Sequence, residues 1–161
     1  MPVVRGLLPI RMLDCLRKGG KPMMYFEMKE FECRDGCRMP AAAKENIEAL
    51  VEQVLDPVRR AYGKAICVTS GYRCPSHNAR IGGVPQSQHV VGQAADIRPA
   101  EQKDGALERL ARTVVANGKW DQMILYPTFI HISWKRSGIN RRQILRKTAG
   151  GYRQIDINQL K

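Results

Sequence analysis

The sequence has no long hydrophobic run, and this absence limits what kind of protein it encodes. No apolar stretch approaches the roughly 18 residues that a membrane-spanning helix needs. Internal repeats and low-complexity tracts are also missing. The 161 residues suffice for one domain with a real core, but not comfortably for two. We therefore expect a single globular domain without a membrane span.

Acidic residues are scarce. The chain has 15 Asp and Glu against 27 Lys and Arg, and residues 132–161 hold eight basic residues against one acidic residue. Such a tail attracts polyanions such as nucleic acid, anionic lipid or acidic cell-wall polymers. No helix-turn-helix, RNA-recognition or zinc-finger pattern is present, and only Trp134 and Tyr152 offer stacking faces near the tail, so nucleic-acid binding is disfavoured. Two interpretations of this basic tail remain open: a solvated surface without a partner, and a surface that contacts wall polymers.

The five cysteines do not form a familiar framework. Cys33 and Cys37 are separated by three residues rather than two, and no second pair completes a set of four metal ligands. The odd number argues against a fully oxidised secreted protein. Cys67 lies in an apolar run and is expected to be a small buried hydrophobe. A Cys33–Cys37 disulfide or minor metal clip remains open.

Histidine is also rare, and two of the three fall in informative places. His89 and Asp96 are seven residues apart across Gly92, which permits a sharp turn, and His131 follows 35 residues after Asp96. Two His and one Asp leave a tetrahedral zinc ion one open position for water, as in catalytic zinc sites. The alternative is that His89 is a surface loop residue and His131 a half-buried one. His77 is expected to be exposed on a short helical turn.

Alternation around His131 predicts a strand with two different faces. Phe129, His131 and Ser133 share one face, whereas the residues between them are apolar or aromatic and suit the core. The face that carries His131 is therefore expected to line a cleft.

Two motifs resemble those of a known family. The block Ser-x-His-x-x-Gly-x-Ala-x-Asp at 87–96, preceded by Ser-Gly-Tyr-Arg at 70–73, is similar to the zinc D-Ala-D-Ala metallopeptidases. That group includes DD-carboxypeptidases, D-Ala-D-Ala dipeptidases and phage L-alanyl-D-glutamate endopeptidases, and the Hedgehog signalling domain shares its fold. The resemblance covers roughly residues 26–134.

The resemblance assigns roles to individual residues. It implies that His89, Asp96 and His131 bind one Zn²⁺, that Arg73 lies beside the scissile carbonyl, and that Ser87 lies at the rim of the substrate site. The implied activity is hydrolysis of an amide bond in peptidoglycan stem peptides, by a carboxypeptidase or an endopeptidase.

One position departs from the family. The family usually has Glu or Asp three residues before the last His ligand, as general base, and this chain has Thr128 there. A threonine hydroxyl does not accept a proton at neutral pH as a carboxylate does. Asp121 is the nearest candidate for the base, although a structural role at a strand end is an equal alternative. A zinc-containing wall-binding module that has lost its base is therefore the second hypothesis for function, and a nucleic-acid-binding protein the third.

The expected fold is α+β, with a small antiparallel sheet and helices packed on one side. Residues 1–22 are expected to be a basic, poorly ordered appendage, 23–139 the peptidase-like domain, and 140–161 a basic extension. The appendage does not fit a secretory signal, because charged residues interrupt its short apolar stretch. We therefore expect synthesis in the cytoplasm and action at the bacterial cell wall, with phage-type release by lysis or carriage on a phage particle as the routes left open. Patterns predict helices and strands over 41–62, 65–70, 94–98, 105–117 and the hairpin 120–134.

Overall fold

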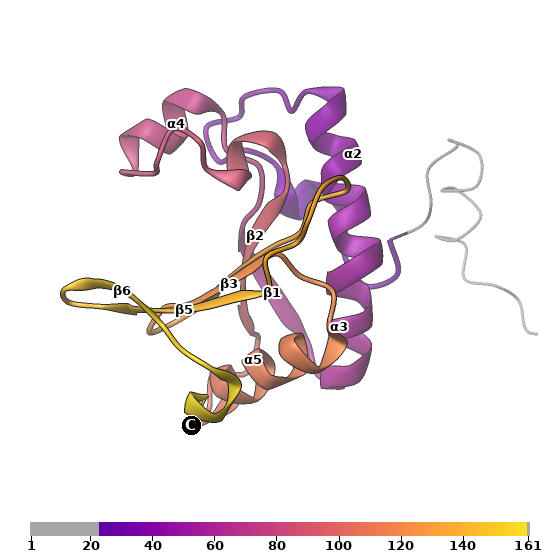
Figure 1. Ribbon diagram of the computed structural model, residues 1–161. Coiled ribbons are helices and arrows are strands. Elements are labelled where there is room, and N and C mark those ends of the chain that lie inside the picture. The colour runs from indigo at the N-terminus through magenta and orange to yellow at the C-terminus, as the bar shows by residue number, and fades with distance from the viewer. Residues whose placement is uncertain (1–22, 161) are drawn as a thin grey trace, which may run out of the picture.

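The computed structural model describes residues 23–160 (Figure 1), so the predicted appendage at 1–22 lies outside the described residues. Six strands form one sheet in the order β1-β2-β4-β3-β5-β6. Their bounds are β1 Ile66–Ser70, β2 Ala94–Pro99, β3 Gln122–Leu125, β4 Ile130–Ser133, β5 Gln143–Thr148 and β6 Gly151–Gln154. The predicted α+β class is confirmed. One pairing, β3 with β5, is parallel, so the sheet is mixed rather than wholly antiparallel.

The helices are α2 (Ala41–Leu50), α3 (Asp56–Tyr62), α4 (Pro75–Arg80) and α5 (Ala106–Asn117). A π-helical turn, η2 (Val51–Leu55), joins α2 to α3, and Pro57 lies at the start of α3. Proline has no backbone N–H to donate to a carbonyl of the preceding turn, and the wider π-helical turn accommodates the missing hydrogen bond. The sequence pattern over 41–62 therefore gives one nearly continuous helical rod (Figure 1).

The core lies between this rod, α5 and one face of the sheet. Cross-strand partners on that face are apolar, for example Met123 opposite Ile132 and Ile97 opposite Ile130. These four side chains are fully buried, as are Ile47, Leu50 and Leu110 on the helices. Burying a side chain of this kind stabilises the fold by about 1.5–3 kcal/mol. Because strand side chains alternate, the residues between them face away from this core.

Residues 140–160 pack against the rest of the domain. β5 pairs with β3, and Ile144, Ile155 and Leu160 are buried in the same core. The guanidinium of Arg112 on α5 also binds the carbonyl oxygen of Leu160. In this part of the chain, β5 and β6 extend the sheet beyond β3. Within residues 23–160, no helix combines the length and apolar character needed to cross a membrane.

Candidate metal centre

Two strands and a turn bring three predicted ligands together. In the register of β2 and β4, Asp96 lies directly opposite His131, on the face away from the core. His89 comes from a 3-10 turn, η3 (Gln88–Val91), which ends at Gly92 with φ +73°. A Cβ atom on Gly92 would stand 2.2 Å from the carbonyl oxygen of Ala43, so only glycine fits this turn.

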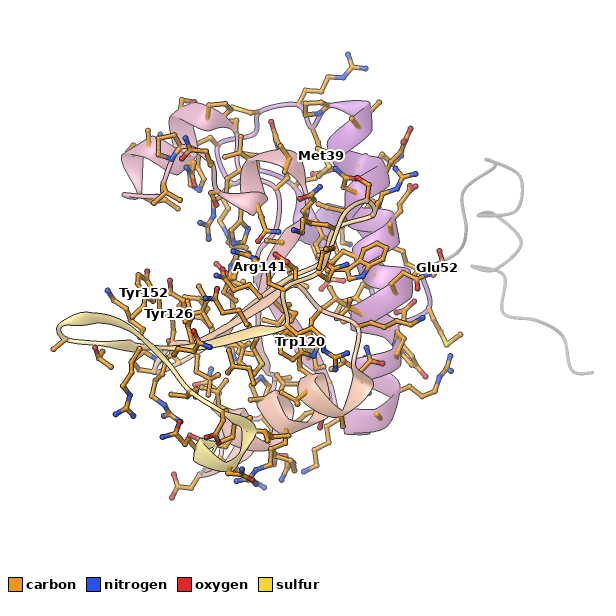
Figure 2. All side chains as sticks on the ribbon, in the orientation of Figure 1. Met39, Glu52, Trp120, Tyr126, Arg141 and Tyr152 are labelled. Atoms are coloured by element: carbon orange, nitrogen blue, oxygen red, sulfur yellow. The ribbon has the colours of Figure 1, made fainter. Side chains whose placement is uncertain are left out.

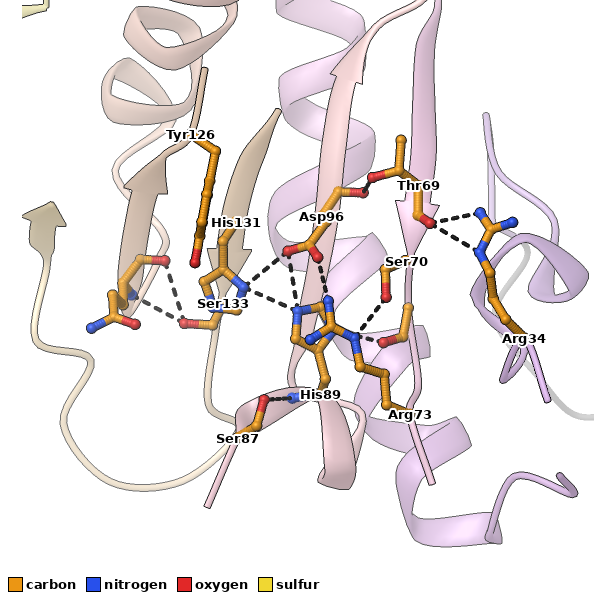
Figure 3. Close-up of polar contacts among 12 residues, drawn as sticks. Arg34, Thr69, Ser70, Arg73, Ser87, His89, Asp96, Tyr126, His131 and Ser133 are labelled. Carbon is orange, nitrogen blue, oxygen red and sulfur yellow. Dashed lines mark hydrogen bonds and ion pairs between the residues drawn. The ribbon is translucent and has the colours of Figure 1, made fainter. Parts of the chain in front are cut away.

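The three ligand atoms form a nearly equilateral triangle (Figure 3). His89 Nε2 lies 3.0 Å from His131 Nδ1, and Asp96 Oδ1 lies 3.1 Å from each of these nitrogens. Ligands about 2.0–2.1 Å from a tetrahedral zinc ion would be about 3.3 Å apart. Two imidazoles and a carboxylate at this spacing therefore fit Zn²⁺ in both chemistry and size.

The surroundings prepare the imidazoles for metal binding. His89 Nδ1 lies 2.7 Å from the carbonyl oxygen of Gly71, an acceptor, so Nδ1 carries the proton and the lone pair of Nε2 points at the triangle. Burial lowers the pKa of His131 more than the hydrogen bond to Asp96 raises it. The lowered pKa favours the neutral form of His131 that a metal requires.

Arg73 lies behind the carboxylate. Its Nη2 is 2.5 Å from Asp96 Oδ2, and its Nε donates to Ser70 Oγ at 2.9 Å. Burial raises the pKa of Asp96, but the neighbouring imidazoles of His131 and His89 outweigh this and hold the pKa well below its ordinary value. Asp96 is therefore ionised, and it turns one oxygen to the imidazoles and the other to Arg73.

Ser87 lies at the edge of this centre. Its hydroxyl accepts a hydrogen bond from the backbone N–H of His89 at 3.4 Å, and Ser87 is the N-cap of η3. This contact positions His89.

Asp121 is fully buried and does not have the surroundings of a general base. Its Oδ1 accepts from the backbone N–H of Arg141 at 2.8 Å, and its Oδ2 accepts from Arg141 Nη2 at 2.6 Å and Gln88 Nε2 at 3.1 Å. Lys135 Nζ lies 3.4 Å from Oδ1. Burial raises the pKa of Asp121, but the bonds from Arg141 dominate and lower it to about 2. A base with that pKa accepts a proton poorly at neutral pH. Thr128, at the family's base position, is exposed in the turn between β3 and β4.

Sequence reasoning missed Tyr126, which lies beside His131 at the end of β3 (Figure 3). Its hydroxyl is 3.0 Å from that of Tyr152, its neighbour across the sheet (Figure 2), and its ring stacks on Phe129. Burial and the Tyr152 hydrogen bond raise the pKa of Tyr126, as does the charge of Asp96. The phenol stays protonated and can donate a hydrogen bond. The properties of this phenol become visible only from its contact with Tyr152, 26 positions later in the chain. No local sequence pattern signals that contact.

His77 was expected to be exposed, and that prediction was wrong. It is buried, and its Nδ1 lies 2.9 Å from Oδ1 of Asp35, a residue of the loop that precedes α2. Arg80 contacts the same carboxylate. His77 is therefore a structural residue outside the metal centre.

The site defines a protein with a buried His-Asp-His cluster that could hold a metal ion and an arginine behind it. The model of the Peptidase M15 family matches residues 24–133, more than two thirds of the chain. The chain therefore belongs to the Peptidase M15 family, whose members use zinc, and the predicted family and cofactor are confirmed.

A curated relative gives a narrower comparison. The chain is 38% identical over 74 residues to a protein of Streptomyces albus G named zinc D-Ala-D-Ala carboxypeptidase. That match covers 45% of this chain and 29% of the relative, so the chain spans less than a third of that protein's length.

Proposed function

We propose that the protein is a zinc peptidase that hydrolyses an amide bond in peptidoglycan stem peptides. The triangle of His89 Nε2, Asp96 Oδ1 and His131 Nδ1, with separations of 3.0–3.1 Å, carries the proposal. The family membership and the name of the curated relative support the substrate class. A zinc ion held by these atoms would supply a Lewis acid and a bound water of lowered pKa.

Arg73 orients Asp96 and stabilises charge on the substrate. Nε and Nη2 are engaged by Ser70 and Asp96, whereas Nη1 makes no hydrogen bond within residues 23–160. This nitrogen is therefore available to the oxygen of a scissile carbonyl as it becomes negative. Removing one such preorganised donor typically slows a reaction about 100- to 1000-fold.

Tyr126 supplies a second donor next to His131. Because its phenol remains neutral, it can donate to the developing oxyanion or to the departing amine. Its hydrogen bond with Tyr152 fixes where the hydroxyl points. We assign Asp121 a structural role, since both of its oxygens are occupied by Arg141 and Gln88.

The second candidate function is a zinc-containing wall-binding module without turnover. The absence of a carboxylate at the base position favours it, because Thr128 cannot take its place. Within residues 23–160, moreover, no further His, Cys, Asp or Glu joins the group formed by the three ligands.

The basic C-terminal segment supports contact with anionic wall polymers. Part of its charge is already used inside the fold, since Arg141 pairs with Asp121 and Arg142 lies over the ring of Trp120. Arg153 on β6 is exposed. Retention on purified walls that falls with added salt would support this contact, and retention unaffected by salt would count against it.

Turnover of a defined substrate separates the two functions. Peptidoglycan fragments ending in D-Ala-D-Ala are incubated with the zinc-loaded protein, and the products are identified by mass. Release of terminal D-Ala indicates a carboxypeptidase, and cleavage within the stem an endopeptidase. Asp96→Asn, which keeps the shape of a ligand but loses its charge, is the control. Binding to the fragments without any zinc-dependent product would leave the wall-binding module as the function.

A further inference from the structure

A second group of metal-ligand side chains lies outside the centre described above. Cys33 and Cys37 belong to the loop after the 3-10 turn η1 (Met28–Phe31), and Cys74 is the N-cap residue of α4. Their three Sγ atoms lie within 4.8 Å of one another. Cys33 and Cys74 are buried, and Cys37 is half-buried. All three are free thiols in this structure.

This spacing suits one thiophilic metal ion. Sulfur ligands stand about 2.3 Å from zinc, so two of them in a tetrahedral site are about 3.8 Å apart. The Sγ atoms of Cys37 and Cys74 are 3.0 Å apart, and small side-chain rotations would open that distance to the required value. Among the residues that the structure describes, no fourth His, Cys, Asp or Glu joins the group. Water would complete the site on the half-exposed side of Cys37.

Hydrogen-bond donors already point at the sulfurs. The backbone N–H of Cys74 donates to Cys33 Sγ at 3.4 Å, and the Ser76 hydroxyl lies 3.2 Å from Cys74 Sγ. Donors of this kind stabilise the negative charge of a thiolate and orient it, as they do around other metal ligands. Three thiols that converge in this way form a ligand set, whereas a disulfide would use only two of them.

The loop that carries Cys33 and Cys37 crosses the segment that carries Arg73. The backbone N–H of Tyr72 donates to the carbonyl oxygen of Phe31 at 2.8 Å, and the Arg34 guanidinium binds the carbonyl oxygen of Thr69 (Figure 3). Gly71 lies so close to Phe31 that a Cβ atom would stand 2.4 Å from its Cα. The carbonyl of Gly71 in turn holds His89. An ion at the cysteines would clamp this loop to the segment that supports the catalytic centre.

We propose that Cys33, Cys37 and Cys74 bind a second, structural divalent metal ion of the zinc type, which fixes the 31–37 loop to residues 70–74. Thiolates are soft ligands that favour such ions, and binding by the folded state alone stabilises it. This proposal does not depend on whether the His-Asp-His centre turns over a substrate.

Cobalt provides the test, because the cysteine site offers sulfur ligands and the His-Asp-His centre does not. The full chain is stripped of metal under reducing conditions and titrated with Co²⁺. Sulfur-to-cobalt charge transfer gives a near-ultraviolet absorption band that a site of two His and one Asp does not give. We expect two equivalents of Co²⁺ per chain, one of them accompanied by this band. His131→Ala should lose one equivalent and keep the band.

Cysteine variants show which sulfur atoms give rise to the absorption band. Cys37→Ser, at the most accessible of the three positions, should abolish or strongly weaken the band and lower the melting temperature in the presence of metal. Cys67→Ser on β1 is the matched control and should retain both. If the Cys33→Ser and Cys74→Ser variants do not fold, the presence or absence of the sulfur-to-cobalt band in the wild-type protein still tests the proposal.

Two results would overturn the proposal. One is Co²⁺ bound at a single site with no sulfur band. The other is a Cys37–Cys74 disulfide, found by peptide mapping without reductant, in folded protein that holds one metal ion. Either result would leave the proposed peptidase activity untouched, because that activity is measured separately by product release.

Discussion

Replacing Asp121 by Asn tests whether this carboxylate acts in structure or in chemistry. Asp121 is completely buried, and its two oxygens accept hydrogen bonds from Arg141 and Gln88. An Asn side chain has nearly the same shape, but it loses the charge and turns an amide donor toward a guanidinium that also donates. We expect the fold to form with reduced stability and the active site to remain intact.

The size of the loss follows from the pKa. The pKa of Asp121 falls from an ordinary value of 3.8 to about 2, which corresponds to about 2 kcal/mol of preference for the ionised, paired form. In a domain of this size, 1 kcal/mol shifts the melting temperature by about 2–4 °C. Asp121→Asn should therefore melt about 4–8 °C below the wild type at neutral pH.

The pair of Asp121 and Arg141 also predicts how the stability of the fold changes in acid. Because the folded-state pKa is lowered, the stabilisation is fully present above the unfolded value of 3.8 and is lost as the pH falls from there toward about 2. The difference between wild type and Asp121→Asn should be constant above about pH 5 and shrink below it. Thermal unfolding followed by circular dichroism over this range measures it.

A control and a refuting result complete the experiment. Asp104→Asn, at an exposed position, should leave the melting temperature within about 1–2 °C, since surface changes usually cost less than about 0.5 kcal/mol. Suppose instead that Asp121→Asn melts like the wild type, keeps its zinc and loses turnover by about 100-fold or more, the scale of general-base assistance. Asp121 would then be the base, and its ion pair with Arg141 would have to open during catalysis.

Four further changes address the centre itself. His131→Ala should remove one equivalent of zinc, measured by elemental analysis, and retention of all the zinc would disprove the ligand assignment. Arg73→Lys should lower turnover about 100-fold with the fold intact, because lysine lacks the planar fork, and unchanged turnover would limit Arg73 to a structural role. Tyr126→Phe should lower kcat with zinc content unchanged, whereas an effect confined to KM would assign the hydroxyl to substrate binding. Thr128→Glu should raise turnover, by up to about 100-fold on the scale of general-base assistance, and equal rates with zinc still bound would show that a carboxylate there does not reach the reaction.

Local patterns predicted the parts of the centre that depend on strand geometry. Alternation around His131 placed it on the face away from the core, and the glycine at 92 indicated the turn that returns His89 toward Asp96. These predictions depend on distances of a few residues along the chain, over which side-chain direction follows from backbone type. The hairpin and the long helical segment were predictable for the same reason.

Contacts between distant segments were not predictable in this way. The partner of Asp121 is Arg141, which reaches it only because β5 runs parallel to β3. The burial of His77 depends on Asp35, 42 residues earlier, and Cys74 meets Cys33 only through the loop after η1. Spacing along the sequence does not predict such contacts until the order of the strands is known.

The pairing of β3 with β5 has a consequence for where this domain can be cut. The family match ends at residue 133, but a fragment ending there would leave β3 as an open edge with unpaired backbone N–H and C=O groups. It would also lack Ile144, Ile155 and Leu160, so the core residues that they cover would be exposed to solvent. Open, hydrophobic edge strands recruit other chains. We therefore expect an expression fragment drawn from the family boundaries to aggregate, and a usable fragment should keep the residues through Leu160.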